Sequence, residues 1–94
     1  LTPSQVIESV AAFFSLTKFD LIGSRRTRDI MVPRQLCIYI LRIDFSLSFE
    51  KIGHEFGGRN HTTIMHACQK IEKGLKKDVK LNNLINSIKQ NLNL

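Results

Sequence analysis

One stretch of the chain decides the fold: residues 48–75 read SFEKIGHEFGGRNHTTIMHACQKIEKGL. Ser48 is a good helix cap, and apolar residues follow it at helical spacing. The paired glycines Gly57 and Gly58 stop this first helix, because glycine tolerates the positive φ of a turn. Asn60 then caps a longer helix. The apolar stripe of the longer helix recurs at helical spacing and comprises Ile64, Ala67, Cys68, Ile71 and Leu75. The stretch therefore predicts a helix-turn-helix.

The longer helix leaves one face free for a partner. A rotation of about 100° per residue places five side chains opposite the apolar stripe: His61, Thr62, Met65, Gln69 and Lys73. Thr62 can offer its methyl group to a thymine methyl, and the amide of Asn60 both donates and accepts hydrogen bonds. The unpaired N–H groups at the start of the helix favour a phosphate. A simpler interpretation stays open, because Asn60 caps the helix in any case and Thr62 and Thr63 also suit an ordinary first turn.

The two ends of the chain have helical patterns as well. The sequence Thr2-Pro3-Ser4-Gln5 has the form of a capping box and predicts a helix that runs to about residue 15. Thr17 opens a short helical turn that Gly23 ends. A last helix is predicted from about Asp78.

Pro33 marks the expected start of the central helix. Proline disfavours helix at the residue before it and suits the first helical position, so we expect residues 24–32 to form a loop. The apolar stripe expected after it comprises Leu36, Ile40 and Ile43. No stretch alternates in the manner of a strand. The sequence thus predicts an all-α fold, a compact bundle of about six helices that contains a helix-turn-helix with a basic loop. We expect residues 1–94 to form one helix-turn-helix domain, a fragment of a longer protein since the chain opens with Leu1.

The positive charge of the chain lies in two blocks. The 94 residues carry a formal net charge of +6. Residues 24–42 contain five arginines, and residues 70–94 contain six lysines. Clustered guanidinium groups suit phosphate and groove contacts, whereas lysines along a helix are as often a solvated face. The charge predicts a polyanionic partner, and by itself it does not choose between DNA, RNA and anionic lipid.

Several function classes lack the residues that they need. No run approaches the about 18 apolar residues of a membrane span, and we expect a cytoplasmic protein without membrane contact. Cys37 and Cys68 fall at apolar positions, which predicts core thiols. His61 and His66 are five residues apart and point about 140° from each other on a helix, which does not suit a shared metal. Without a carboxylate pair or nucleophile motif, we expect neither enzyme activity nor a bound metal. The six Phe and one Tyr fall mostly at core-like positions, so we do not expect aromatic side chains that stack on RNA bases.

At residues 57–67, GGRNHTTIMHA, the sequence resembles the signature of the bacterial replication initiator DnaA family. The similarity extends over most of residues 1–75, through the following segments: Ser24-Arg25-Arg26-Thr27-Arg28, Pro33-Arg34-Gln35, Ser48, Ile52-Gly53 and Lys70-Ile71. The resemblance implies the C-terminal domain of the initiator, which binds short asymmetric duplex sequences, the DnaA boxes, at the replication origin. It also implies association with the nucleoid, and as partners the rest of an initiator chain and further initiator copies. No cofactor is expected in this domain, because ATP belongs to the family's separate ATPase module.

The resemblance assigns roles to individual residues. It implies that Arg26 enters the minor groove of DNA, where A·T-rich narrowing deepens the negative potential. His61 and Thr62 match residues that meet thymine methyl groups in the major groove. The residues that match contacts to the DNA backbone or to nearby bases are Thr63, Arg34, Gln35, Arg42 and His66. Arg25 and Arg28 are placed on phosphates, and Lys70 completes the expected DNA-binding set.

Asn60 departs from the family pattern. The family usually has Asp at this position, which accepts a hydrogen bond from a cytosine amino group. Asn can accept as well, but it also donates and suits adenine better. We therefore expect altered discrimination at one base pair, by about 1–3 kcal/mol. Binding to RNA, acidic lipid or a protein partner without sequence preference is the alternative function.

Overall fold

A computed structural model describes all residues, 1–94, and contains six α-helices and no strand. In chain order the helices are α1 (Pro3–Phe13), α2 (Lys18–Ile22), α3 (Arg28–Ile43), α4 (Phe49–Glu55), α5 (His61–Leu75) and α6 (Val79–Asn91). The predicted all-α bundle is confirmed, and α4 and α5 form the predicted helix-turn-helix.

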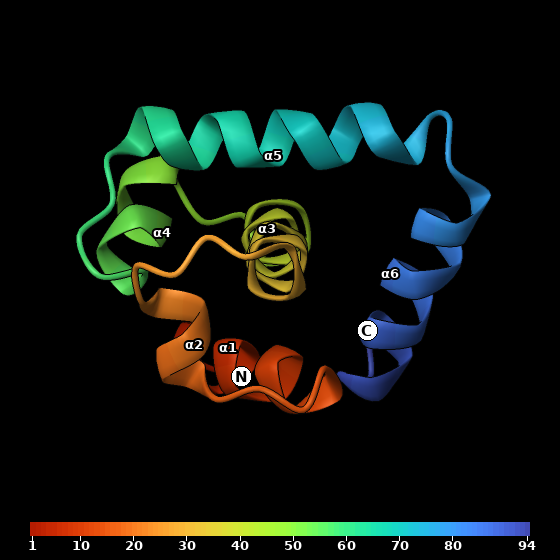
Figure 1. The fold of residues 1–94 in the computed structure, drawn as a ribbon, viewed down its shortest axis with the longest axis horizontal. Helices are drawn as coiled ribbons and strands as arrows, with labels where there is room; N and C mark the ends of the chain where they lie inside the picture. Colours follow the sequence, from red (N-terminus) through yellow and green to blue (C-terminus); the bar gives the residue numbers. More distant parts are fainter.

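The helix α3 is the centre of the bundle. Figure 1 views it end-on, with the other five helices arranged around it. Its residues Leu36, Cys37, Ile38, Ile40 and Leu41 are all buried. The other helices each contribute one apolar face to the same core, and this pattern is typical of a central helix surrounded by amphipathic ones. Both predicted core thiols are buried and unpaired, and burial raises the pKa of Cys68 to about 11 and that of Cys37 further.

Local capping chemistry explains where most helices begin. The side chains of five N-cap residues accept backbone N–H groups in the first turn that follows, and these residues are Thr2, Thr17, Ser48, Asn60 and Asp78. All five positions were predicted as helix starts. Such a cap contributes about 1 kcal/mol, so these boundaries follow from the sequence.

The prediction of a loop over residues 24–32 is wrong in its second half. The helix α3 begins at Arg28, and Pro33 lies buried inside it. Only residues 24–27 form the connection from α2, and we call them the arginine loop. The missing N–H of Pro33 leaves the carbonyl of Asp29 without its helical donor, but Asp29 lies in the exposed first turn of α3, where water can replace it. Burial of Ile30 and Pro33 against the core outweighs the preference of proline for the first position of a helix.

One further expectation needs correction, and one is confirmed. Ile43 does not continue the α3 stripe, since it ends the helix with 53% of its surface exposed. Gly23 ends α2, as predicted, and its φ is −76°. The glycine is required for space, because a Cβ atom there would lie 2.7 Å from the carbonyl oxygen of Phe19.

Glycines also shape the turn between α4 and α5. Gly57 and Gly58 have φ angles of +73° and +80°, as predicted for the turn. Gly53 is buried in α4, and a Cβ atom at this position would overlap the carbonyl oxygen of Arg59. The carbonyl oxygen of Gly53 accepts from the backbone N–H groups of both Gly58 and Arg59, at 3.0 and 2.9 Å. The close approach therefore fixes the start of α5 against α4.

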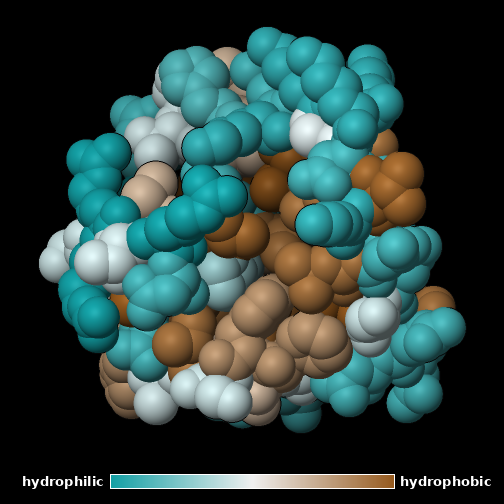
Figure 2. Space-filling model, turned by 45° about the vertical axis from the view of Figure 1, so that its right-hand side comes forward, coloured by the Kyte–Doolittle hydropathy of each residue, from teal (hydrophilic) through white to brown (hydrophobic).

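The surface is divided by polarity. Figure 2 shows hydrophilic side chains over the top of the molecule, where α5 runs, above a hollowed apolar area.

No helix is both long enough and apolar enough to cross a membrane.

Candidate nucleic-acid interface

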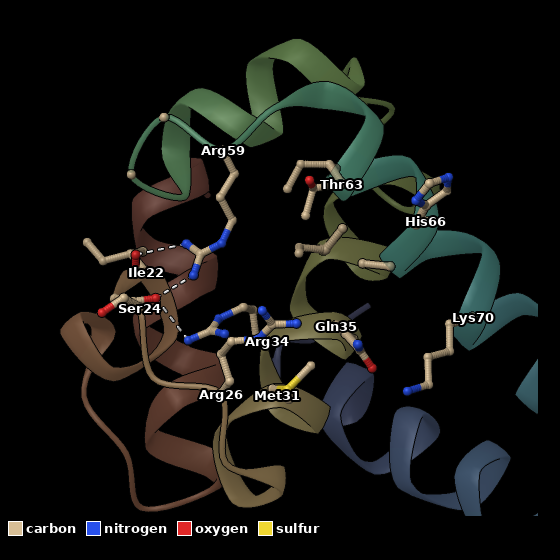
Figure 3. A pocket seen from close by; sticks show the side chains of 16 residues that line it. Ile22, Ser24, Arg26, Met31, Arg34, Gln35, Arg59, Thr63, His66 and Lys70 are labelled. Carbon is tan, nitrogen blue, oxygen red and sulfur yellow. Dashed lines mark hydrogen bonds between the residues drawn. The ribbon is translucent and has the colours of Figure 1, made fainter.

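A groove of about 720 Å³ lies between the arginine loop, α3, the α4–α5 turn and α5 (Figure 3). Its basic residues are Arg26, Arg34, Arg59 and Lys70, and no Asp or Glu lines it. The groove combines four positive charges with no acidic group to neutralise them. This composition suits a polyanion.

One side of α5 forms a wall of the groove. Thr63, His66 and Lys70 lie three and four residues apart, so they project from the same side of the helix, and all three are exposed. The adjacent positions Ile64 and Cys68 are buried in the core. The helix is thus held by its apolar stripe while polar side chains face the groove.

The first turn of α5 stands free in solvent. Asn60, His61 and Thr62 are all exposed, and none of them packs against the core. The Oδ1 atom of Asn60 accepts from the backbone N–H of Thr62 at 2.8 Å, so the predicted cap is present. The capping bond uses the oxygen, and the amide nitrogen of Asn60 has no protein partner. The start of α5 therefore presents a hydrogen-bond donor, an imidazole and a threonine methyl group to solvent.

The arginine loop lies across the groove from α5. Arg25 and Arg26 in the loop are exposed, as is Arg28 at the first position of α3. Arg25 has one acidic neighbour, Asp20 at 3.9 Å, and such an exposed pair contributes little stability. The pKa of Asp20 is lowered by a hydrogen bond from the backbone of Thr17 and, to a smaller extent, by the charge of Arg25. The loop arginines are therefore available to an external anion.

Arg34 lies buried at the base of the groove, with 7% of its surface exposed. Its guanidinium donates to three backbone carbonyl oxygens of the α2 end: Leu21 at 2.6 Å, Asp20 at 3.1 Å and Gly23 at 3.0 Å. Burial, followed by the charges of Arg59 and Arg26, lowers the pKa of Arg34. The residue expected to bind DNA thus has a second role within the fold, since it ties α3 to the root of the arginine loop.

Arg59 is the one basic residue of the groove for which no role was predicted. It is half-buried, and its guanidinium donates to the carbonyl oxygens of Ile22 at 2.9 Å and Gly23 (Figure 3). It also donates to the carbonyl oxygen of Phe56 at 2.8 Å. Burial lowers its pKa. Two of its acceptors lie 36 and 37 residues away in the sequence, and backbone carbonyls leave no trace in a residue pattern.

Arg42 lies apart from the other predicted residues. It sits near the far end of α3, about 21 Å along the helix from Arg28 at 1.5 Å per residue. Its guanidinium donates to the carbonyl oxygen of Leu47 at 3.0 Å and stacks over the ring of Phe49 at 4.2 Å. These contacts join α3 to α4, and they do not bring Arg42 to the groove.

The structure thus sorts the twelve predicted DNA-binding residues by position. Six line the groove: Arg26, Arg34, Gln35, Thr63, His66 and Lys70. Three form the exposed start of α5: Asn60, His61 and Thr62. Arg25 and Arg28 flank Arg26 along the chain, and Arg42 alone lies elsewhere. No three His, Cys, Asp or Glu side chains lie close enough together to hold a metal ion.

Comparison with known proteins identifies the relatives of this chain. The family described as bacterial dnaA protein helix-turn-helix matches residues 3–71. The chain is 45% identical over 85 residues to the chromosomal replication initiator protein DnaA of Limosilactobacillus reuteri (strain DSM 20016), which covers 90% of this chain and 19% of the relative. It is 42% identical over 89 residues to the protein of the same name from Lactobacillus delbrueckii subsp. bulgaricus, covering 95% of this chain and 20% of the relative. The chain spans about a fifth of the length of these relatives. At this coverage and identity, the chain belongs to the bacterial DnaA helix-turn-helix family.

Proposed function

We propose that this chain binds double-stranded DNA at DnaA boxes of a replication origin and thereby serves the initiation of chromosome replication. The start of α5 contacts base edges in the major groove, and the arginine loop enters the adjacent minor groove. One observation carries the proposal: two solvent-exposed elements of DNA-binding chemistry flank a single basic groove that contains no acidic side chain.

The major-groove contact follows from the free first turn of α5. A recognition helix places its N-terminal residues on base edges while its opposite face packs on the scaffold. Thr62 presents a methyl group to a thymine methyl, and His61 packs beside it or donates a hydrogen bond. The amide of Asn60 has its oxygen engaged in the helix cap, so it presents a donor to the base that it faces.

The minor-groove contact follows from the exposed arginine loop. A guanidinium is attracted to a narrow, A·T-rich minor groove by its strong negative potential. Arg26 is the arginine of the loop that lines the basic groove, and no carboxylate competes for it. Reading of both grooves by one small domain explains how a monomer could recognise an asymmetric site, since no two-fold protein is needed.

Phosphate contacts supply affinity without specificity. Thr63, His66 and Lys70 on α5 face Gln35 and the buried Arg34 across the groove, and Arg25 and Arg28 extend the basic surface. If about five phosphates are neutralised, the logarithm of the binding constant falls with the logarithm of salt concentration at a slope of about −4 to −5.

The relatives' names extend the proposal beyond this chain. Both are chromosomal replication initiator proteins, and they are about five times as long as the matched region. We propose that residues 1–94 act as one DNA-binding domain of such an initiator, in association with the nucleoid. Other initiator copies and the remainder of an initiator chain are its proposed protein partners.

Selection from a randomised duplex pool tests the proposal. The expected result is one enriched asymmetric motif, bound at least about 10³-fold more tightly than random duplex of equal length. Enrichment of no motif, or equal binding of duplex, RNA and acidic lipid vesicles, would show a polyanion-binding module without sequence preference.

A further inference from the structure

Two guanidinium groups cover the end of α2. Four consecutive carbonyl oxygens, those of Asp20, Leu21, Ile22 and Gly23, each accept a hydrogen bond from an arginine side chain. Figure 3 shows the bonds that end at Ile22 and at the following residue, Gly23. Arg34 reaches three of them from α3, and Arg59 reaches two from the α4–α5 turn. The last carbonyls of a helix lack partners within that helix and carry its negative dipole end, so cationic donors are favoured there.

The Arg59 bonds join the two elements proposed to contact DNA. Arg59 directly precedes Asn60, the N-cap of α5, and its own backbone N–H is held by Gly53 at 2.9 Å. Its acceptor Gly23 lies three residues before Arg26. A path of one side chain and a few backbone bonds therefore links the start of α5 to the arginine loop. No other hydrogen bond connects the α4–α5 turn to the residues that precede this loop.

The link places like charges close together without an acidic partner. Neither Arg34 nor Arg59 forms an ion pair, and both approach the same carbonyl oxygen of Gly23. Burial lowers the pKa of each, which reflects the free energy required to hold these charges out of water. A neutral hydrogen-bond donor would bind the same carbonyl oxygens with a smaller desolvation penalty. The retained charge keeps the groove basic at the point where the loop begins.

We infer that Arg59 is a positioning residue: its hydrogen bonds to Ile22 and Gly23 fix the arginine loop relative to the start of α5, so that Arg26 and Thr62 engage one duplex in a single register. The inference rests on the proposed function, and it assigns no DNA contact to Arg59. It explains why a half-buried arginine occupies the residue before the helix cap.

A double-mutant cycle separates positioning from general stabilisation. Arg59→Lys retains the charge, but a single ammonium group cannot span the carbonyls of Ile22, Phe56 and Gly23 as the planar guanidinium does. Binding is measured for the duplex selected by the unmodified chain and for a random duplex of equal length. The same substitution is then combined with Arg26→Ala and, as the matched control cycle, with Thr62→Ala.

If Arg59 acts through the loop, the effect of Arg59→Lys on sequence preference depends on Arg26. Sequence preference is the ratio of the binding constants for the selected and the random duplex. We expect Arg59→Lys to lower this ratio about five- to tenfold in the unmodified chain, and less than about twofold in a chain that already carries Arg26→Ala. In the control cycle, Arg59→Lys and Thr62→Ala should reduce the sequence preference independently, so that their fold losses multiply, because α5 remains in place in Arg59→Lys. Multiplying losses in both cycles, or unchanged preference in Arg59→Lys, would overturn the inference. If Arg26→Ala and Thr62→Ala alone leave the preference unchanged, the proposed function itself fails.

Two additions guard against a variant that does not fold. Circular dichroism verifies helix content, and Arg59→Gln provides a second substitution with a planar but shorter donor. In the unmodified chain, backbone order parameters of residues 24–27 give a readout that needs no variant. We expect values near about 0.85, as in the helices, and values below about 0.6 would contradict a fixed loop.

Discussion

Gly53→Ala should destabilise the protein although alanine is the better helix former. The substitution adds a Cβ atom in the middle of α4, where helix propensity alone would favour alanine by about 1 kcal/mol. In this position the added atom overlaps the carbonyl oxygen of Arg59 and lies 3.6 Å from Cγ1 of Ile64. The obstacle is backbone, so no side-chain rotation relieves it. The α4–α5 turn must move away from α4.

The magnitude follows from what this movement disrupts. Overpacking of a tight contact costs about 1–3 kcal/mol. The carbonyl of Gly53 also accepts three backbone N–H groups, at 2.9 to 3.2 Å, and each bond lost costs about 1 kcal/mol. With two bonds weakened and the propensity gain subtracted, we expect a net loss of about 3 kcal/mol in the free energy of unfolding.

Urea denaturation followed by circular dichroism measures this loss. Gly58→Ala is the matched control, because its φ of +80° strains alanine by about 1–2 kcal/mol while no atom lies within 4 Å of the added Cβ. Gly53→Ala should therefore be the less stable of the two. A Gly53→Ala protein within about 0.5 kcal/mol of the unmodified chain would refute the steric argument.

Three other predictions concern binding and stability. Arg26→Ala and Thr62→Ala should weaken binding to the selected duplex more than to random duplex, whereas Lys73→Ala on the solvent side of α5 should weaken binding to the two duplexes equally. Competition titrations measure the ratio of the two binding constants. Equal losses on the two duplexes for Arg26→Ala and Thr62→Ala would show that neither residue contributes to sequence preference. Asn60→Asp keeps the capping oxygen but replaces the free amide donor by an acceptor, so preference at one base pair should shift by about 1–3 kcal/mol with little change in stability. A binding series over single-pair variants of the duplex measures this shift, and an identical preference profile would contradict it. Arg34→Met removes three hydrogen bonds to carbonyls, one buried and two partly buried, and should cost about 3 kcal/mol in thermal or urea unfolding. A change below about 1 kcal/mol would mean that water replaces the guanidinium.

Features that depend on neighbouring residues were predictable from the sequence. The five capping residues and the two turn glycines act on the backbone within three residues of themselves, so their effects can be recognised locally. The apolar stripe of α5 was likewise predictable, because one face of that helix packs on the core and the other meets solvent. The free first turn of α5 follows from the same periodicity.

Features set by tertiary packing were not predictable. Pro33 was expected to begin a helix, but α3 is buried on nearly all sides, and the added burial of Ile30 outweighs one lost hydrogen bond. Because α3 is central, several of its faces are buried, and one apolar stripe at helical spacing does not describe its core residues. Ile43 was therefore wrongly predicted as a core residue. Arg59 and Arg34 bind backbone carbonyls of a distant segment, and no residue type at the acceptor position signals such a bond.

The central claim is that two elements of this chain contact two grooves of one duplex. Inosine·cytosine pairs test it most directly, because they resemble A·T in the minor groove, where the guanine amino group is absent, and G·C in the major groove. Each A·T pair of the selected duplex is replaced in turn by inosine·cytosine and by G·C, and the binding constant is measured. The account predicts two adjacent sets of positions: one that tolerates inosine·cytosine but not G·C, and that loses this discrimination in Arg26→Ala, and one that tolerates neither. Loss of binding with inosine·cytosine at every sensitive position would contradict it, since all sequence preference would then arise in the major groove.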